Sequence, residues 1–200
     1  MELIERINKD VKQILSEKRY NHSVGVMKRA EEIAKIYGID IEKARLVGLS
    51  HDIAKEMNVE ESLRYVKENN IEIDEVERIN TSLLHGKIGA DICRKRYGFN
   101  NQMTDAIIYH TTGNVNMDTF AKVIFLADKT EESRGNYIDL ETFNSAIDKD
   151  LDEGMICMLK QTIRYSLDKG GLVHPDSVFL LNKLIKENLE KYWIIEYNLI

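Results

Sequence analysis

The sequence predicts an all-α protein built as one helical bundle, and three observations support this. Apolar residues recur three and four positions apart in nearly every window, which is the spacing of a helix face and not of a strand. One proline and 11 glycines interrupt the chain only sparsely. The 200 residues, 43% of them hydrophobic, suffice for one sizeable core and are few for two. We therefore expect a single domain over residues 1–200.

Apolar periodicity and capping residues divide the first half of the chain into four expected helices. Asp40 suits an N-cap, because its side chain can accept a hydrogen bond from the first turn of a helix. Gly38 suits the C-cap of the preceding helix. The helix that begins near Glu60 should stop at the two asparagines that follow it. The expected ranges are 2–18, 22–37, 40 to about 52, and 60–69.

The second half of the chain keeps the same helical spacing of apolar residues. Five helices are expected there, at 81–97, 101–110, 117–129, 150–168, and from 176 into the C-terminal region. The last residues, from Trp193 to Ile200, form an apolar tail that hints at self-association, so a homodimer is a possible assembly.

Charge and hydropathy exclude several classes of protein. The chain has 34 acidic and 28 basic residues, so its net charge of -6 offers no broad attraction to nucleic acid or to an anionic membrane. Its longest apolar runs are far below the roughly 18 to 20 residues that span a bilayer. The amphipathic N-terminus does not resemble a secretory signal, so we expect a cytoplasmic protein. Cys93 and Cys157 are then expected to be free thiols.

Four polar residues fall on helix faces that are otherwise apolar: His22, His85, His110 and Asp128. Residues three, four and seven or eight positions apart share a helix face, and all four share theirs with aliphatic residues. A lone ionised carboxylate is very costly to bury, so Asp128 must be neutral, ion-paired or bound to a metal. Three inward imidazoles make a metal the simplest partner.

His51 and Asp52 are adjacent, so on a helix their side chains would diverge by about 100°. They can nevertheless flank one point. A pair of metal ions there could take His51 on one side while the two oxygens of Asp52 bridge both ions. Lys55 follows His51 by four residues and should project from the same side, where it could meet a substrate phosphate.

Each of these residues, taken singly, also has an ordinary structural explanation. A buried histidine is more often a hydrogen-bonded core residue than a ligand, and Lys55 alone would be a solvated lysine. Asp128 could pair with Lys129 or Arg134. The combination favours a metal site, because four of the five histidines fall on expected inward faces of separate helices. His174 lies in a glycine-containing loop and is left outside the metal site.

The order of these residues resembles that of a known superfamily. A histidine, a His-Asp pair, two further histidines and a late aspartate are typical of HD-domain metal-dependent phosphohydrolases, and residues 51–55 match the His-Asp-x-x-Lys signature. Segments 19–26, 83–86, 108–113 and 125–134 look like the YqeK family of that superfamily. The resemblance implies a metal-site core over about 19–134, followed by C-terminal helices over about 140–192.

The resemblance also implies an activity and its metals. The YqeK family acts as a symmetrical bis(5'-nucleosyl)-tetraphosphatase, which splits diadenosine tetraphosphate at its centre into two ADP. It uses two metal ions, and a hydroxide bridging them would attack an internal phosphorus. The resemblance indicates iron, while imidazole and carboxylate donors also suit manganese or another transition metal.

The resemblance assigns a role to each candidate residue. The first ion would take His22, His51, Asp52 and Asp128, and the second would take His85, His110 and the other oxygen of Asp52. Catalytic roles are expected for Asp52, Lys55 and Arg134. Substrate contacts are expected from Lys55, Thr111, Thr112, Gly113 and Arg134. Lys55 and Arg134 would neutralise charge on the phosphate chain, and the threonine-glycine segment would supply hydroxyl and backbone donors.

Two other functions are compatible with this pattern. A different HD-domain enzyme, such as a nucleoside monophosphate phosphohydrolase, would keep every metal ligand and change only the pocket. A non-catalytic nucleotide-sensing module could retain the fold alone. Degenerate modules usually lose metal ligands, and none of the expected ligands is missing here, so the sequence favours an enzyme.

Overall fold

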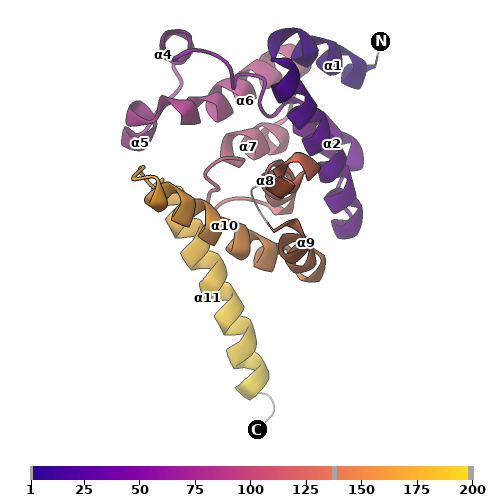
Figure 1. The fold of residues 1–200 in the computed structure, drawn as a ribbon, viewed down its shortest axis with the longest axis vertical. Helices are drawn as coiled ribbons and strands as arrows, with labels where there is room; N and C mark the ends of the chain where they lie inside the picture. Colours follow the sequence, from indigo (N-terminus) through magenta and orange to yellow (C-terminus); the bar gives the residue numbers. More distant parts are fainter. Residues whose placement is uncertain (1, 137–138, 198–200) are drawn as a thin grey trace.

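The computed structural model describes residues 2–136 and 139–197, with side chains for all of these except 135, 136 and 192–197. The side chains of the apolar tail, 193–200, therefore lie outside the described residues. All regular structure in the described ranges is helical, as the sequence predicts, and the helices form one bundle from which the last helix extends (Figure 1). No helix in these ranges is long and apolar enough to cross a membrane.

The first three helices lie close to their expected positions. They are α1 (Leu3–Ile14), α2 (Glu17–Tyr37) and α3 (Ile41–Ser50). Gly38 adopts the left-handed conformation as the C-cap of α2, and Asp40 caps α3, which confirms both expectations. Helix α2 begins five residues earlier than expected, because the hydroxyl of Ser16 accepts a hydrogen bond from the Arg19 amide and caps the helix there.

The middle of the chain contains one helix that was not expected. Its elements are α4 (Val59–Glu68), α5 (Glu75–Ile79), the 3-10 helix η1 (Thr81–Leu83), α6 (Leu84–Tyr97) and α7 (Asn101–Tyr109). The unexpected helix is α5. Asp74 and Glu77 form a capping box, in which each side chain accepts a 2.9 Å hydrogen bond from the other residue's amide.

The C-terminal part also contains one unexpected helix. Its elements are α8 (Thr119–Thr130), the 3-10 helix η2 (Glu132–Asn136), α9 (Leu140–Lys149), α10 (Leu151–Asp168) and α11 (Pro175–Tyr197). The unexpected helix is α9, which fills the gap between the helices expected at 117–129 and 150–168 and lies within the C-terminal helices expected over about 140–192. Asp139 caps α9, and Phe143 and Ile147, four residues apart, bury its apolar face.

Helix α8 lies at the centre of the bundle. It packs against α2, α3 and α7, while α6 packs on α7, and residues 123–127 of α8 are completely buried. Helices α9, α10 and α11 pack on one another in chain order, and the far end of α11 projects from the body (Figure 1). This arrangement brings together one face each of α2, α6, α7 and α8, from which the candidate residues project.

Candidate metal centre

The structure brings all six predicted metal ligands to one buried place. Each is at most 8% exposed, and the predicted inward orientation is thus confirmed. They come from five separate segments, so only the tertiary fold brings them together. The residues are His22 on α2, His51 and Asp52 after α3, His85 on α6, His110 at the end of α7, and Asp128 on α8.

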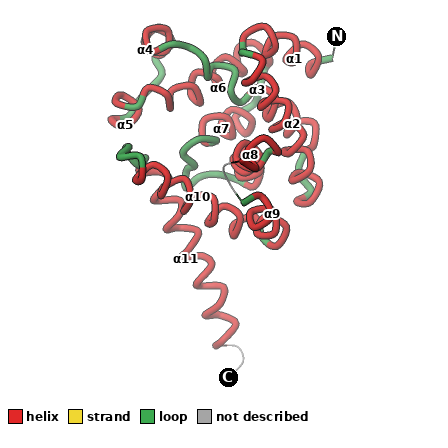
Figure 2. The backbone as a smooth tube through the Cα atoms, in the orientation of Figure 1, coloured by secondary structure: helices red, strands yellow, loops and turns green. Residues whose placement is uncertain are grey.

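His51 and Asp52 do not lie on a helix, contrary to the expectation. Helix α3 ends at Ser50, and the next residues form a tight turn in which the Ile53 amide donates to the Ser50 carbonyl and the Lys55 amide to the Asp52 carbonyl. Figure 2 draws the chain between α3 and α4 as a loop. The turn lets both adjacent side chains face the same centre, which a regular helix would not.

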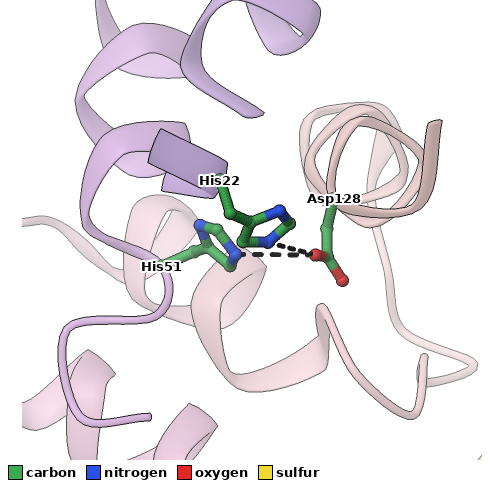
Figure 3. Close-up of side chains that lie close together, drawn as sticks. All are labelled: His22, His51 and Asp128. Carbon is green, nitrogen blue, oxygen red and sulfur yellow. Dashed lines mark hydrogen bonds and ion pairs between the residues drawn. The ribbon is translucent and has the colours of Figure 1, made fainter. Parts of the chain in front are cut away.

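In the first group of side chains, the rings of His22 and His51 lie next to each other and both approach one oxygen of Asp128 (Figure 3). Oδ1 of this carboxylate lies 3.0 Å from Nε2 of His22 and 3.6 Å from Nε2 of His51. These three donor atoms lie within 4.8 Å of one another, which is close enough for one ion to contact all three.

The two oxygens of Asp52 face different histidines. Oδ2 lies 3.6 Å from Nε2 of His51 and 3.8 Å from Nε2 of His22. Oδ1 lies 3.3 Å from Nε2 of His85 and 3.5 Å from Nε2 of His110. The carboxylate therefore lies between two pairs of imidazoles. The two pairs also contact each other directly, because the rings of His51 and His110 meet edge to face with their centroids 5.0 Å apart.

Backbone hydrogen bonds fix the orientation of three of the four rings. In each case Nδ1 lies against the carbonyl three residues earlier and must donate to it, so Nε2 carries no proton in the neutral ring. The pairs are His51 with Gly48 at 2.8 Å, His85 with Ser82 at 2.5 Å and His110 with Ile107 at 2.6 Å. Three Nε2 lone pairs thus point to the centre, as metal-binding imidazoles require.

The surroundings of the His51 Nε2 atom show whether a metal ion would fit. Nε2 of His51 is fully buried and has no hydrogen-bond partner among the described residues. A buried polar atom without a partner is costly, yet this one faces two carboxylates. A cation between the nitrogen and the carboxylate oxygens satisfies all of them, so the donor set fits a metal ion of the kind that imidazole and carboxylate bind together.

The charges of the centre are set by burial and by contact. Burial opposes ionisation of Asp52 and Asp128, but the adjacent histidines and, for Asp128, Lys129 overcome it, and the pKa of each carboxyl is held well below its usual range. Burial lowers the pKa of His110 to about 4 and also lowers that of His85. At His22 burial acts in the same direction, but the hydrogen bonds with Asp128 and Glu131 outweigh it and raise the pKa. Anionic carboxylates beside neutral imidazoles, as at His85 and His110, are the protonation states that ligands need.

Glu131 belongs to the centre, although sequence reasoning gave it no role. It is 3% exposed, and its Oε1 lies 3.0 Å from Nδ1 of His22. Its carboxylate also accepts hydrogen bonds from the amide and the hydroxyl of Ser133. Gly25 makes the room, because a Cβ atom there would lie 2.7 Å from Oε2 of Glu131. The spacing of three residues from Asp128 was the signal available in the sequence.

Four cationic side chains surround the carboxylates. The sequence analysis named Lys55 and Arg134 as substrate contacts and Lys129 as a possible partner of Asp128, but it gave Arg19 no role. Arg19 lies 2.8 Å from Oδ2 of Asp52, and Lys129 and Arg134 each lie 3.2 Å from an Asp128 oxygen. Lys55 Nζ lies 3.3 Å from Nε2 of His85. Burial lowers the pKa of Lys55 and of Lys129, and the carboxylates oppose this shift.

The segment after His110 is only partly placed as expected. The hydroxyl of Thr111 lies 3.1 Å from Nε2 of His110 and 3.3 Å from that of His85. The hydroxyl of Thr112 instead donates to the Gly113 carbonyl. The Gly113 amide donates to the Tyr109 carbonyl at 2.8 Å, so in this arrangement it is not free to contact a substrate.

His174 lies outside the six-residue centre, as expected. Its Nε2 lies 2.8 Å from Oδ2 of Asp74, which joins the loop before α11 to the start of α5. Asp74, Glu77 and His174 could in principle hold an ion of their own. However, Glu77 is already paired with Lys87 at 2.6 Å and His174 with Asp74 at 2.8 Å, so these side chains need no ion to satisfy them.

Comparison with known proteins agrees with this geometry. The HD domain family matches residues 19–133. Two relatives are named symmetrical bis(5'-nucleosyl)-tetraphosphatase: one from Halalkalibacterium halodurans, 35% identical, and one from Bacillus subtilis, 32% identical, each over 88% of this chain and 94% of its own length. A crystal structure from Clostridium acetobutylicum, described as a predicted HD superfamily hydrolase involved in NAD metabolism, is 35% identical with a TM-score of 0.87 and covers 92% of this chain and 97% of its own.

Proposed function

The chain belongs to the HD domain family, and on this basis we propose that it is a metal-dependent hydrolase that splits diadenosine tetraphosphate symmetrically into two ADP. The relatives named for this reaction are aligned over most of both chains, which supports the same activity for this chain. All six residues expected to be metal ligands are also buried here.

The position of Asp52 is the observation that supports this function best. Its two oxygens face two separate pairs of imidazoles, as a carboxylate that bridges two ions must. We therefore assign His22, His51 and Asp128 to one ion and His85 and His110 to a second, with Asp52 shared. The mixture of nitrogen and oxygen donors suits a first-row transition metal, and iron is the one we propose.

Held by these residues, two such ions would lower the pKa of a bound water and so would supply a nucleophile at neutral pH. The chain's own residues orient the metal-binding side chains and contact the substrate. Glu131 holds the His22 ring by its Nδ1, and backbone carbonyls hold the other three rings, so the donor atoms need no rearrangement. Thr111 stands beside His85 and His110, where its hydroxyl can donate to a phosphate oxygen.

The cations around the carboxylates suit a substrate that carries several negative charges. Arg19 and Arg134 have side chains 30% and 37% exposed, so both can turn toward a polyphosphate at the opening of the centre. Guanidinium groups can hold two phosphate oxygens at once. Lys55 lies deeper, beside His85, and can neutralise the charge that develops on the departing phosphate.

Product analysis tests this function directly. Purified metal-loaded protein is incubated with diadenosine tetraphosphate, and the nucleotides are separated by chromatography. Two ADP per substrate is the expected result. ATP with AMP would show asymmetric cleavage and contradict the proposal, and so would an absence of cleavage by protein shown to contain both ions. Metal analysis of the same sample tests the choice of iron.

A further inference from the structure

A cavity of about 90 Å³ lies beside the proposed metal centre. It is bounded by η1, by the residues that follow His110, by α10 and by the loop that leads into α11. In Figure 1 this loop turns back beside α5, on the side of the bundle away from α2. The C-terminal helices, which supply none of the six ligands, thus form one side of a pocket next to the ligands.

Thr111 connects the cavity to the centre. It lines the cavity, and its hydroxyl lies 3.1 Å from Nε2 of His110. A molecule whose phosphates lie at the centre could therefore reach the cavity across this one residue. The cavity is thus placed to receive whatever is attached to those phosphates.

The lining mixes aliphatic side chains with hydroxyls, an amide and His174, and it lacks the lysines and arginines that surround the centre. Leu83, Ile163 and Val173 contribute aliphatic surface, and none of the lining residues is an aspartate, glutamate, lysine or arginine. Two hydroxyls of α10 are turned to their own helix, since Thr162 donates to the Met158 carbonyl and Ser166 to the Thr162 carbonyl. Aliphatic surface without lysine or arginine suits the faces of a flat uncharged ring better than it suits a phosphate group.

Three contacts hold the wall of the cavity in place. Ser177 at the start of α11 donates to the Thr112 carbonyl at 2.6 Å. Nδ1 of His174 accepts a hydrogen bond from the Asp176 amide, so Nε2 carries the proton and donates to Asp74 at 2.8 Å. The wall is therefore anchored both to the segment beside the centre and to α5. Because it is already ordered, ligand binding costs little conformational entropy there.

We propose that this cavity binds one nucleobase of the dinucleotide substrate. The inference rests on the proposed function, because that function supplies a ligand with phosphates at its centre and an uncharged aromatic base at each end. The cavity is too small for a whole nucleotide, since about 90 Å³ is well below the roughly 300 to 1,000 Å³ of pockets that enclose a drug-sized ligand. It can admit a ring system while ribose and phosphates lie outside, along Thr111.

Filling the cavity tests the proposal. Val173→Phe, from the loop, and Ser166→Phe, from α10, each place a ring in the space. Leu167→Phe is the matched control, because Leu167 is 62% exposed on α10 and does not line the cavity. Calorimetry on metal-loaded protein compares the affinity for ADP with that for pyrophosphate, which has no base. Thermal unfolding shows that each variant is folded.

We expect both filling variants to weaken ADP binding at least about tenfold, to raise KM for diadenosine tetraphosphate similarly, and to leave kcat and pyrophosphate binding unchanged. The control should match the wild type. Unchanged ADP affinity in both folded variants, or equal losses for ADP and pyrophosphate, would overturn the proposal. If the wild type does not cleave the dinucleotide, the proposed function fails, while the comparison of ADP with pyrophosphate still decides whether the cavity binds a base.

Discussion

The Nε2 atoms of His85 and His110 lie 3.0 Å apart, although each ring already uses its Nδ1 to donate to a backbone carbonyl. In the neutral rings neither Nε2 carries a proton, so two lone pairs face each other beside Oδ1 of Asp52. Such a contact is repulsive unless a positive charge lies between the atoms. A proton can supply it, but burial lowers the pKa of both rings, so a metal ion is the better partner at neutral pH.

The first prediction concerns His110. His110→Ala should lose the ion that we assign to His85 and His110 and keep the one assigned to His22, His51 and Asp128. The metal content should fall from about two to about one ion per chain, measured by elemental analysis after dialysis against metal-free buffer. His174→Ala is the control and should retain both ions. Loss of both ions from folded His110→Ala protein would show that the two groups are not separate sites.

Asp52 should behave differently, because both groups share it. Asp52→Asn keeps the size of the side chain but removes the charge that faces four imidazoles, so we expect both ions to be lost and hydrolysis to fall at least about 100-fold. The same elemental analysis and the chromatographic assay measure these effects. A variant that retains two ions at the wild-type level would contradict the bridging role.

Much of this centre could be predicted from the sequence, because its residues break local patterns. Asp128, His22, His85 and His110 each share a helix face with small and aliphatic residues. Their burial can therefore be predicted from the helical period of 3.6 residues alone. The capping residues Gly38 and Asp40 likewise fix helix ends through local chemistry. Such signals need no knowledge of the tertiary fold.

The features that sequence reasoning missed depend on distant contacts. Arg19 contacts Asp52, and Glu131 contacts His22, across 33 and 109 residues of chain. The turn at His51 also could not be foreseen, because its apolar surroundings continue the helical pattern of α3. Helix α5 is different, since the capping box of Asp74 and Glu77 was readable in the sequence.

Glu131 should tune the affinity for the metal without being a ligand. In Glu131→Gln the amide oxygen can still accept from His22, but the negative charge is lost, so metal affinity should fall about 10- to 100-fold. Competition with a chelator of known affinity measures this. Glu132→Gln, at an exposed neighbouring position, is the control and should bind metal like the wild type. Equal affinity in the two variants would show that Glu131 has only a packing role.

Gly25 provides an independent test of the same contact. In Gly25→Ala the new Cβ would lie 2.7 Å from Oε2 of Glu131, so the carboxylate must move from His22 and metal affinity should fall. In a Glu131→Ala background the obstructed atom is absent, and Gly25→Ala should have almost no further effect. A double-mutant cycle measured by chelator competition isolates this coupling. Additive losses would mean that Gly25→Ala acts elsewhere, for example on α2 itself.

The stability of the metal-free protein should depend on pH through His110. Burial lowers the pKa of His110 from 6.5 to about 4 in the folded state. Between these values the unfolded chain binds the proton and the folded one does not, so the free energy of unfolding rises with pH across this window. The contribution is complete above pH 6.5 and is lost as the pH falls toward 4. The full effect is about 3 kcal/mol, at about 1.4 kcal/mol per pH unit.

Comparison with a variant isolates this effect from the other titrating groups, including His22, whose raised pKa acts in the opposite direction. His110→Gln has no imidazole to protonate, so its free energy of unfolding should fall by about 2 kcal/mol less than that of the wild type between pH 6.5 and 5. Urea denaturation in the presence of a chelator measures both proteins. Parallel pH profiles would mean that His110 takes up its proton in the folded protein as readily as in the unfolded chain, which its buried position between Asp52 and the Ile107 carbonyl argues against.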